Sequence, residues 1–256
     1  MKISLISYAF HQLTRQGMMD AFGYLETVKY RYHLDYADLW NGTLASTDPE
    51  YLAKVKEALE ERELGLANLA VDGAHIWEDD PDAREANYQK ALAHLKAGEL
   101  LGAKTIRIDA GGPRDSLKFT PEQFDHIVMR YKEFAQRAYD NGYKVGPENH
   151  WGPEAAPEEM VRLIKAVDSP AFGVLLHAGR WYGDNAEQGD AMVVNSVMHT
   201  HLTNALSDEK LEATMVMIRD AGYDGIWGVE TVGSYFQVEV QLARVAAVLD
   251  KWRAES

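Results

Sequence analysis

The 256-residue sequence contains no cysteine, which excludes disulfide bonds and metal sites built from thiolates. Basic residues are scarce, with 26 Lys and Arg against 40 Asp and Glu and a formal net charge of −14. Nucleic acids and anionic membrane surfaces are bound through clustered positive charge, so neither partner is expected. Apolar runs long enough to span a bilayer are also missing, and the first seven residues are too short and polar for a signal peptide. We therefore expect a cytoplasmic protein.

The composition is that of a globular protein, with 46% hydrophobic and 26% charged residues. Eight short apolar runs alternate with about eight helical patterns, and no Pro- or Ser-rich linker interrupts them. The runs lie at residues 3–7, 34–39, 66–71, 105–108, 143–145, 172–177, 197–201 and 225–230. This alternation predicts a parallel α/β sheet, and at this length a (β/α)₈ TIM barrel forming a single domain, residues 1–256. A doubly wound open sheet is the alternative, but no glycine-rich fingerprint follows the first run.

Several helices carry recognisable start and stop signals. Apolar residues recur at helical spacing between Met18 and Val28. Residues 120–123, Thr-Pro-Glu-Gln, form a variant of the capping box, and the helix that they begin is expected to end at Asn141-Gly142. The segment 187–195 gives a weaker signal and predicts a short helix.

Four successive apolar runs lead into a side chain that can bind a metal ion: Glu148, His177, His201 and Glu230. Their spacings of 29, 24 and 29 residues each suit one strand, one helix and two loops. Taken singly, each residue is more often a surface or hydrogen-bonded group than a ligand. The carboxyl ends of barrel strands meet at one face, however, and catalytic residues of TIM barrels lie there. The joint pattern therefore predicts one site.

Two carboxylates and two imidazoles suit a divalent ion, with Mn²⁺, Co²⁺, Fe²⁺, Ni²⁺ or Zn²⁺ favoured over Mg²⁺. A six-coordinate ion with four protein ligands leaves two positions for a sugar carbonyl and its α-hydroxyl. The ion would then acidify the neighbouring C–H bond and stabilise an enediolate. Glu148 or Glu230 can remove the proton, and the other can return it from the opposite face.

Further residues near the strand ends suit a polyol ligand. The candidates for substrate binding are Trp40, His75, Arg107, His150, Trp151 and Arg180. Arg107 lies before the end of its strand, so an ion pair with a barrel carboxylate is the alternative for it. His199 points the same way as His201 and is interpreted as a packed interior residue or as support for the site.

At these residues the sequence resembles the xylose isomerase-like TIM-barrel superfamily of sugar isomerases and epimerases. The resemblance covers essentially the whole chain and includes Ala-Asp-Leu-Trp-Asn-Gly at 37–42, Leu-Gly-Ala-Lys-Thr at 101–105 and Glu-Asn-His at 148–150. It implies binding of Mn²⁺ or a similar ion, with Glu148, His201 and Glu230 in three of the four ligand places. In ketose 3-epimerases the two glutamates are also the acid and base, which implies that role for Glu148 and Glu230. Relatives are often dimers or tetramers, which leaves a homo-oligomer open.

The sequence departs from the family pattern in three places. His177 stands where the family usually has Asp, and Arg180 stands where many relatives have His. Ketose 3-epimerases carry an Arg a few residues after His201, and this chain has none there. These departures argue against a plain ketose 3-epimerase. Endonuclease IV shares the superfamily, but the acidic charge and the missing extra metal ligands argue against DNA repair.

The leading prediction is a divalent-metal isomerase or epimerase that enolises a sugar or keto-sugar. The first alternative is a lyase or dehydratase acting on a keto-sugar, inosose or 3-keto-glycoside, because the same enolate can expel a β-substituent. The second alternative is a non-catalytic sugar-binding subunit that keeps the ion for structure.

Overall fold

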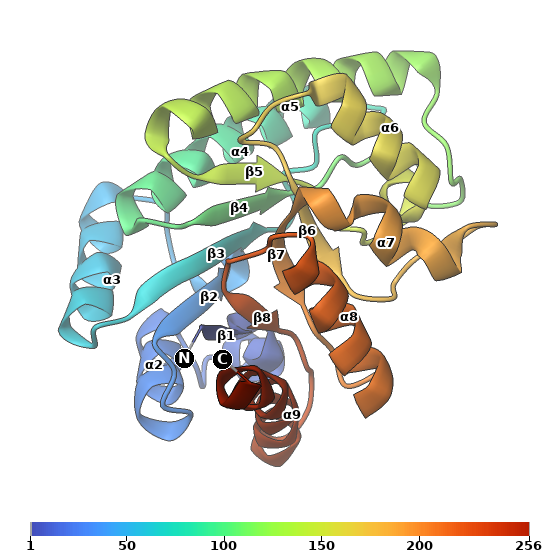
Figure 1. Cartoon of the computed structure of the whole chain (residues 1–256). Helices are drawn as coiled ribbons and strands as arrows, with labels where there is room; N and C mark the ends of the chain where they lie inside the picture. Colours follow the sequence, from blue (N-terminus) through green and yellow to red (C-terminus); the bar gives the residue numbers. More distant parts are fainter. Residues whose placement is uncertain (1, 256) are drawn as a thin grey trace.

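The computed structural model describes residues 2–255, in which helices surround a set of parallel strands (Figure 1). The strands in this part of the chain are β1 (Ile3–Ile6), β2 (Tyr36–Trp40), β3 (Gly65–Val71), β4 (Thr105–Ile108), β5 (Lys144–Gly146), β6 (Val174–His177), β7 (Val197–His201) and β8 (Trp227–Val229). The α-helices are α1 (His11–Arg15), α2 (Ala21–Glu26), α3 (Pro49–Glu61), α4 (Pro81–Leu101), α5 (Pro121–Asn141), α6 (Pro157–Val167), α7 (Gly189–Val193), α8 (Asp208–Asp220) and α9 (Tyr235–Glu255).

All paired strands run parallel, which confirms the predicted α/β class. They form one six-stranded sheet in the order β5-β4-β3-β2-β1-β8 and a two-stranded sheet of β6 and β7. Isolated parallel bridges join β5 to β6 and β7 to β8, at Val145–Phe172, Glu148–Leu175 and Leu202–Val229. The eight predicted strands are therefore present in the described residues, but the ladder between them is interrupted at two joints.

Glycines allow a close backbone approach at both joints. A Cβ atom on Gly146 would lie 1.8 Å from the carbonyl oxygen of Gly173, so β5 and β6 can approach only through glycine. Pro147 follows and has no N–H with which to continue the ladder. At the other joint, a Cβ atom on Gly228 would lie 2.1 Å from the carbonyl oxygen of Thr200. The absence of side chains at these glycines lets neighbouring strands lie close together here.

Most of the helix starts and ends predicted from the sequence are found in the structure. Thr120 and Gln123 form the reciprocal capping box at the start of α5, and Gly142 ends that helix in the left-handed conformation. The weak segment at 187–195 contains the five-residue helix α7, as expected. The pattern from Met18 to Val28 is not one helix, because Asp20 caps a new helix at Ala21 and π-helical turns follow at Thr27–Arg31.

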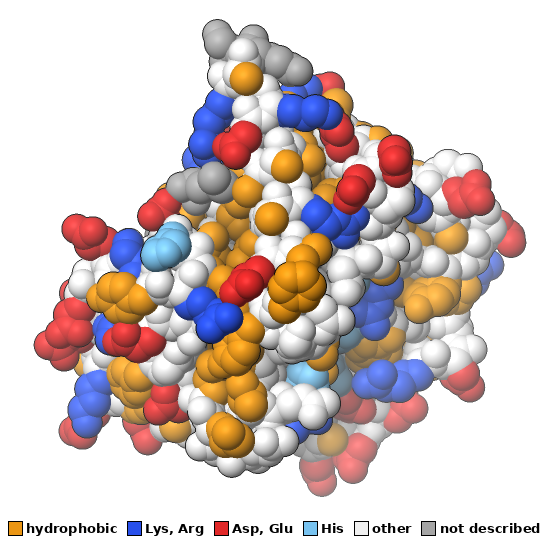
Figure 2. Space-filling view, turned by 90° about the horizontal axis from the view of Figure 1, so that it is seen from below, with side chains coloured by type: hydrophobic (Ala, Val, Ile, Leu, Met, Phe, Trp, Pro, Cys, Tyr) orange, Lys and Arg blue, Asp and Glu red, His pale blue; other side chains and the backbone are white. Residues whose placement is uncertain are grey.

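The layer between the strands and the helices is apolar, with Leu5, Leu39, Leu69 and Ile106 among its fully buried side chains. The face on which α9 lies carries a band of hydrophobic side chains (Figure 2). Tyr235, Phe236 and Val240 are the exposed large apolar residues of that helix. Among the described residues, no helix has both the length and the apolar character required to cross a membrane.

Candidate metal centre

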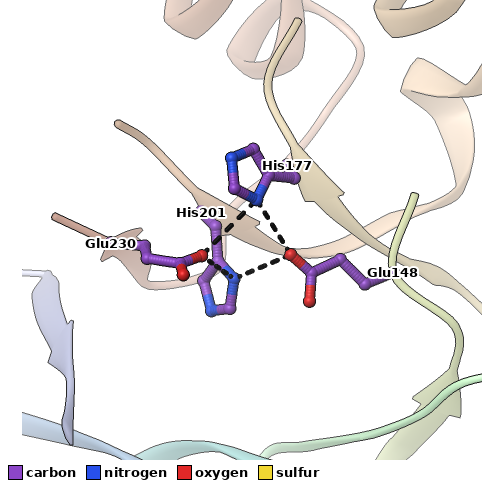
Figure 3. A group of neighbouring side chains, drawn as sticks. All are labelled: Glu148, His177, His201 and Glu230. Atoms are coloured by element: carbon purple, nitrogen blue, oxygen red, sulfur yellow. Dashed lines mark hydrogen bonds and ion pairs between the residues drawn. The ribbon is translucent and has the colours of Figure 1, made fainter. Parts of the chain in front are cut away.

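Four side chains from four neighbouring strand ends point toward one another (Figure 3). His177 and His201 are the last residues of β6 and β7, Glu230 directly follows β8, and Glu148 lies two residues beyond β5. His177 Nδ1 lies 2.9 Å from Glu148 Oε1 and 3.4 Å from Glu230 Oε2. His201 Nδ1 lies 3.2 Å and 3.0 Å from the same two oxygens. The four residues predicted from the strand ends are thus brought together.

The spacing of these four atoms suits a single ion. Nitrogen and oxygen ligands lie about 2.1 Å from a bound first-row ion, so two ligands at right angles are about 3.0 Å apart. The four measured separations, 2.9–3.4 Å, match that edge length. All four ligand atoms lie within 4.8 Å of one another. The residues present therefore fit a divalent ion with two imidazole and two carboxylate ligands.

The electrostatics of the cluster favour a cation at its centre. Burial alone would raise the pKa of Glu148, but the facing imidazoles, His201 above all, hold it well below its usual value. The same opposition between burial and His201 lowers the pKa of Glu230. Burial would lower the pKa of His201, and the Glu148 and Glu230 carboxylates instead raise it well above its usual value. Two carboxylates are therefore kept ionised around one position.

A buried carboxylate lies on the inner side of this cluster. Asp38 Oδ2, at the middle of β2, is 2.7 Å from His199 Nε2 and 3.8 Å from His201 Nε2. Burial would raise the pKa of Asp38, but His199 and His201 lower it to about 2. His201 Nε2 is buried and forms no hydrogen bond within the described residues. The ionised Asp38 therefore favours a proton on this nitrogen, so an ion would bind at Nδ1 in place of the proton held there by the two glutamates. His199 is a buried interior residue that contacts the same carboxylate.

Arg107 is buried among three carboxylates. Its guanidinium lies 2.6 Å from Asp109 and 2.9 Å from Asp72, and Nε is 3.5 Å from Glu148 Oε2. Burial would lower the pKa of Arg107, but Asp109 and Glu148 raise it above its usual value. Arg107 therefore forms the ion pairs with barrel carboxylates that were the alternative to a role in substrate binding. Glu148 is held from two sides, with Oε1 facing the imidazoles and Oε2 facing Arg107.

Beside the cluster lies a cavity of about 210 Å³, smaller than the 300–1,000 Å³ usual for ligand sites. Its lining includes Glu148, His201 and Glu230. Of the six predicted substrate-binding residues, Trp40, Arg107, His150 and Arg180 also line it. His75 and Trp151 do not. Their rings lie against each other with centroids 5.2 Å apart, His75 contacts Glu78, and Arg114 stacks on Trp151.

Sequence reasoning missed three acidic residues of this region. Asp72 follows β3 and lines the cavity, with its carboxylate held by Arg107 and by Trp40 Nε1 at 2.7 Å. Asp109 follows β4 and contacts His150 Nδ1 at 3.2 Å. Both could have been found by the strand-end rule that found the four ligands. Asp38 lies inside β2, and no local signal marks it.

Comparisons with known proteins define the fold. A family model described as xylose isomerase-like TIM barrel matches residues 30–252. Searching the curated proteins gives no match. A xylose isomerase-like TIM barrel protein from Mycobacterium smegmatis, solved in complex with magnesium, superposes with a TM-score of 0.74 at 16% identity, covering 97% of this chain and 95% of that one.

Two solved enzymes are also similar in structure. The 3-keto-D-glucoside 4-epimerase from E. coli, in its apo form, has a TM-score of 0.74 at 15% identity over 98% of this chain and 99% of its own. The probable 3-DHS dehydratase from Bacillus anthracis has a TM-score of 0.67 at 14% identity, again over 98% and 99%. At these identities the likeness concerns the fold, which is that of a TIM barrel.

Proposed function

This chain belongs to the xylose isomerase-like TIM-barrel family, and from that premise we propose that it is a divalent-metal enzyme that isomerises or epimerises a small keto-sugar. The observation that carries the proposal is the convergence of Glu148, His177, His201 and Glu230 beside a small polar cavity. We assign these four residues as the metal ligands, with Mn²⁺ as the first ion to test. The epimerase among the structural neighbours supports this class of reaction.

The two glutamates are proposed to move the proton. When bound, the ion would supply Lewis-acid polarisation of a substrate carbonyl. Glu230 directs Oε2 toward the imidazoles, and Oε1 makes no hydrogen bond or ion pair with the described residues. With 17% of its side chain exposed, against 3% for Glu148, Glu230 is the carboxylate with freer access to a ligand in the cavity. We assign proton removal to Glu230 Oε1, and Glu148 is the second carboxylate of the pair.

One contact favours elimination as the second candidate reaction. His150 lines the cavity, and its Nδ1 lies 3.2 Å from Asp109 Oδ2. Burial would lower the pKa of His150, but Glu148 and Asp109 raise it. A protonated imidazole at this place can donate to a departing oxygen, as a dehydratase or lyase requires. The dehydratase among the structural neighbours is consistent with this reaction.

The first test is the metal content of the protein. Elemental analysis of the purified wild type is expected to give one divalent ion per chain, or one ion taken up from added Mn²⁺. A His177→Ala variant removes one of four ligands, so we expect its Mn²⁺ affinity to fall by at least about tenfold, measured by calorimetric titration. The His75→Ala variant is the control, because His75 lies outside the cavity lining. Wild-type protein that neither contains nor binds an ion would contradict the proposal.

The second test detects proton removal directly. Ion-loaded protein is incubated in D₂O with D-fructose, D-fructose 6-phosphate and 2-keto-D-gluconate. We expect deuterium to enter at carbon next to the carbonyl of at least one compound, as measured by mass spectrometry. An unsaturated product in the NMR spectrum would assign elimination in place of isomerisation. Ion-loaded protein that exchanges no carbon-bound hydrogen in any of the three would favour the non-catalytic alternative.

A further inference from the structure

Arg180 is a cation of the cavity wall that has no carboxylate partner. It is half-buried, and it forms no ion pair with any residue between 2 and 255. Several other arginines of this acidic chain are paired, as Arg62 is with Glu26 and Arg137 with Glu99. Arg107, the other arginine of the wall, is neutralised by Asp72 and Asp109. A half-buried guanidinium without a carboxylate partner keeps N–H donors available to a ligand in the cavity.

The turn that carries Arg180 is tightly built. The Arg180 carbonyl accepts a hydrogen bond from Asn149 Nδ2 at 2.9 Å, and the Arg180 N–H donates to the His177 carbonyl at 3.1 Å. The fully buried Asn149 also accepts a hydrogen bond from the His177 N–H at 2.7 Å. Gly179, with φ of +74°, turns the chain, and its N–H donates to Asp190. The backbone of Arg180 is thereby held at a fixed distance from the end of β6.

The side chain of Arg180 extends toward the four candidate metal ligands. Its Nη1 lies 3.4 Å from His177 Nδ1, the nitrogen assigned above to the ion. An ion bound there would take the lone pair and leave the guanidinium without this acceptor. A carboxylate at position 177 could pair with Arg180, whereas an imidazole adds no negative charge. The ion and Arg180 would then be two cationic groups facing one cavity.

We propose that the substrate carries an anionic group, a carboxylate or a phosphate, which Arg180 binds beside the metal centre. The planar fork of a guanidinium matches the two oxygens of either group. The substrate class is therefore a sugar acid or a sugar phosphate instead of a neutral sugar. This inference rests on the proposed function for the place of the ion, and it assigns a specificity role to Arg180.

The test compares three ligands of one carbon skeleton: D-glycerate, glycerol 3-phosphate and glycerol. Their affinities for Mn²⁺-loaded protein are measured by calorimetric titration. Charge-assisted hydrogen bonds predict that one of the two anions binds wild-type protein about 10- to 100-fold more tightly than glycerol. Arg180→Met is expected to remove that preference, and Arg180→Lys to keep part of it. Arg114→Met is the control, because Arg114 stacks on Trp151 away from the cavity lining.

The outcomes separate the inference from the proposed function. A preference for D-glycerate that is lost in Arg180→Met supports a sugar acid, and one for glycerol 3-phosphate lost in the same way supports a sugar phosphate. Equal affinity for all three ligands, no binding of any at millimolar concentration, or a preference that survives in Arg180→Met overturns the inference. Each of these results is obtained on protein shown to hold its ion. Failure of the proposed function is instead seen as absence of ion binding.

Discussion

A Glu230→Gln variant is expected to keep its divalent ion and to lose exchange of carbon-bound hydrogen by about 10²- to 10⁴-fold. Glutamine retains a ligand oxygen, and its NH₂ group can take the place of Oε1, which forms no hydrogen bond or ion pair with the described residues. The amide cannot accept a proton as the carboxylate does. Exchange is measured in D₂O with whichever compound the wild type exchanges, and ion affinity is measured by calorimetric titration.

The Glu148→Gln variant is the matched comparison. Its amide would have to direct oxygen toward the imidazoles and NH₂ toward the Arg107 guanidinium, so that donor would face donor at the 3.5 Å contact. We therefore expect Mn²⁺ affinity to fall by at least about 100-fold, beyond the loss at Glu230→Gln. Equal ion affinities in the two variants, or near wild-type exchange in Glu230→Gln, would contradict this division of roles.

An Arg107→Met variant is expected to lose about 3–5 kcal/mol of unfolding free energy. Methionine approximates the length of the arginine stem, but it leaves the buried Asp109 and Glu148 carboxylates without their cation. For a chain of this size the melting temperature should fall by roughly 10 °C. Thermal and urea unfolding of the ion-free protein measure the effect without the contribution of a bound metal.

Arg137→Met provides the control for the loss of an ion pair near the surface. Arg137 pairs with Glu99 at 2.7 Å, and both side chains are partly exposed. Solvent screens such a pair, so its loss is expected to cost under about 1 kcal/mol. If Arg107→Met is no more destabilising than Arg137→Met, the buried network around Arg107 contributes little to stability.

The four candidate ligands could be predicted because each follows an apolar strand, and parallel strands bring their carboxyl ends to one face. Asp72 and Asp109 also follow strands, so the same rule could have placed them at the site. Their pairing with Arg107 is a separate matter, because Asp109 is 2 residues away whereas Asp72 is 35 residues away and reaches the guanidinium only through the register of β3 against β4. The role of Asp38 likewise depends on the approach of β2 to His199 across the barrel interior.

The fold, too, was predictable from the sequence only in part. Periodicity located the strands, but it gives no sign of the close backbone approaches at Gly146–Gly173 and Gly228–Thr200, beside which the ladder is interrupted. Such contacts depend on residues far apart in the sequence. The early helical pattern holds for Phe22 and Leu25 in α2 and for Val28 in the π-helical turns, whereas Met18 and Met19 precede the Asp20 cap.

The two joints in the sheet point to a second role for the candidate metal centre, which is to stabilise the fold. β6 and β7 form a separate two-stranded sheet, which backbone hydrogen bonds such as Gly173 N–H to the Val145 carbonyl and Glu230 N–H to the Leu202 carbonyl join to the neighbouring strands around the isolated bridges. An ion shared by residues 148, 177, 201 and 230 would cross-link the chain over loops of 29, 24 and 29 residues, as disulfides do in proteins that have cysteine. Because such an ion binds the folded chain, the free energy of unfolding would rise with the logarithm of the free ion concentration. The availability of metal would then set part of the free energy of unfolding of this protein.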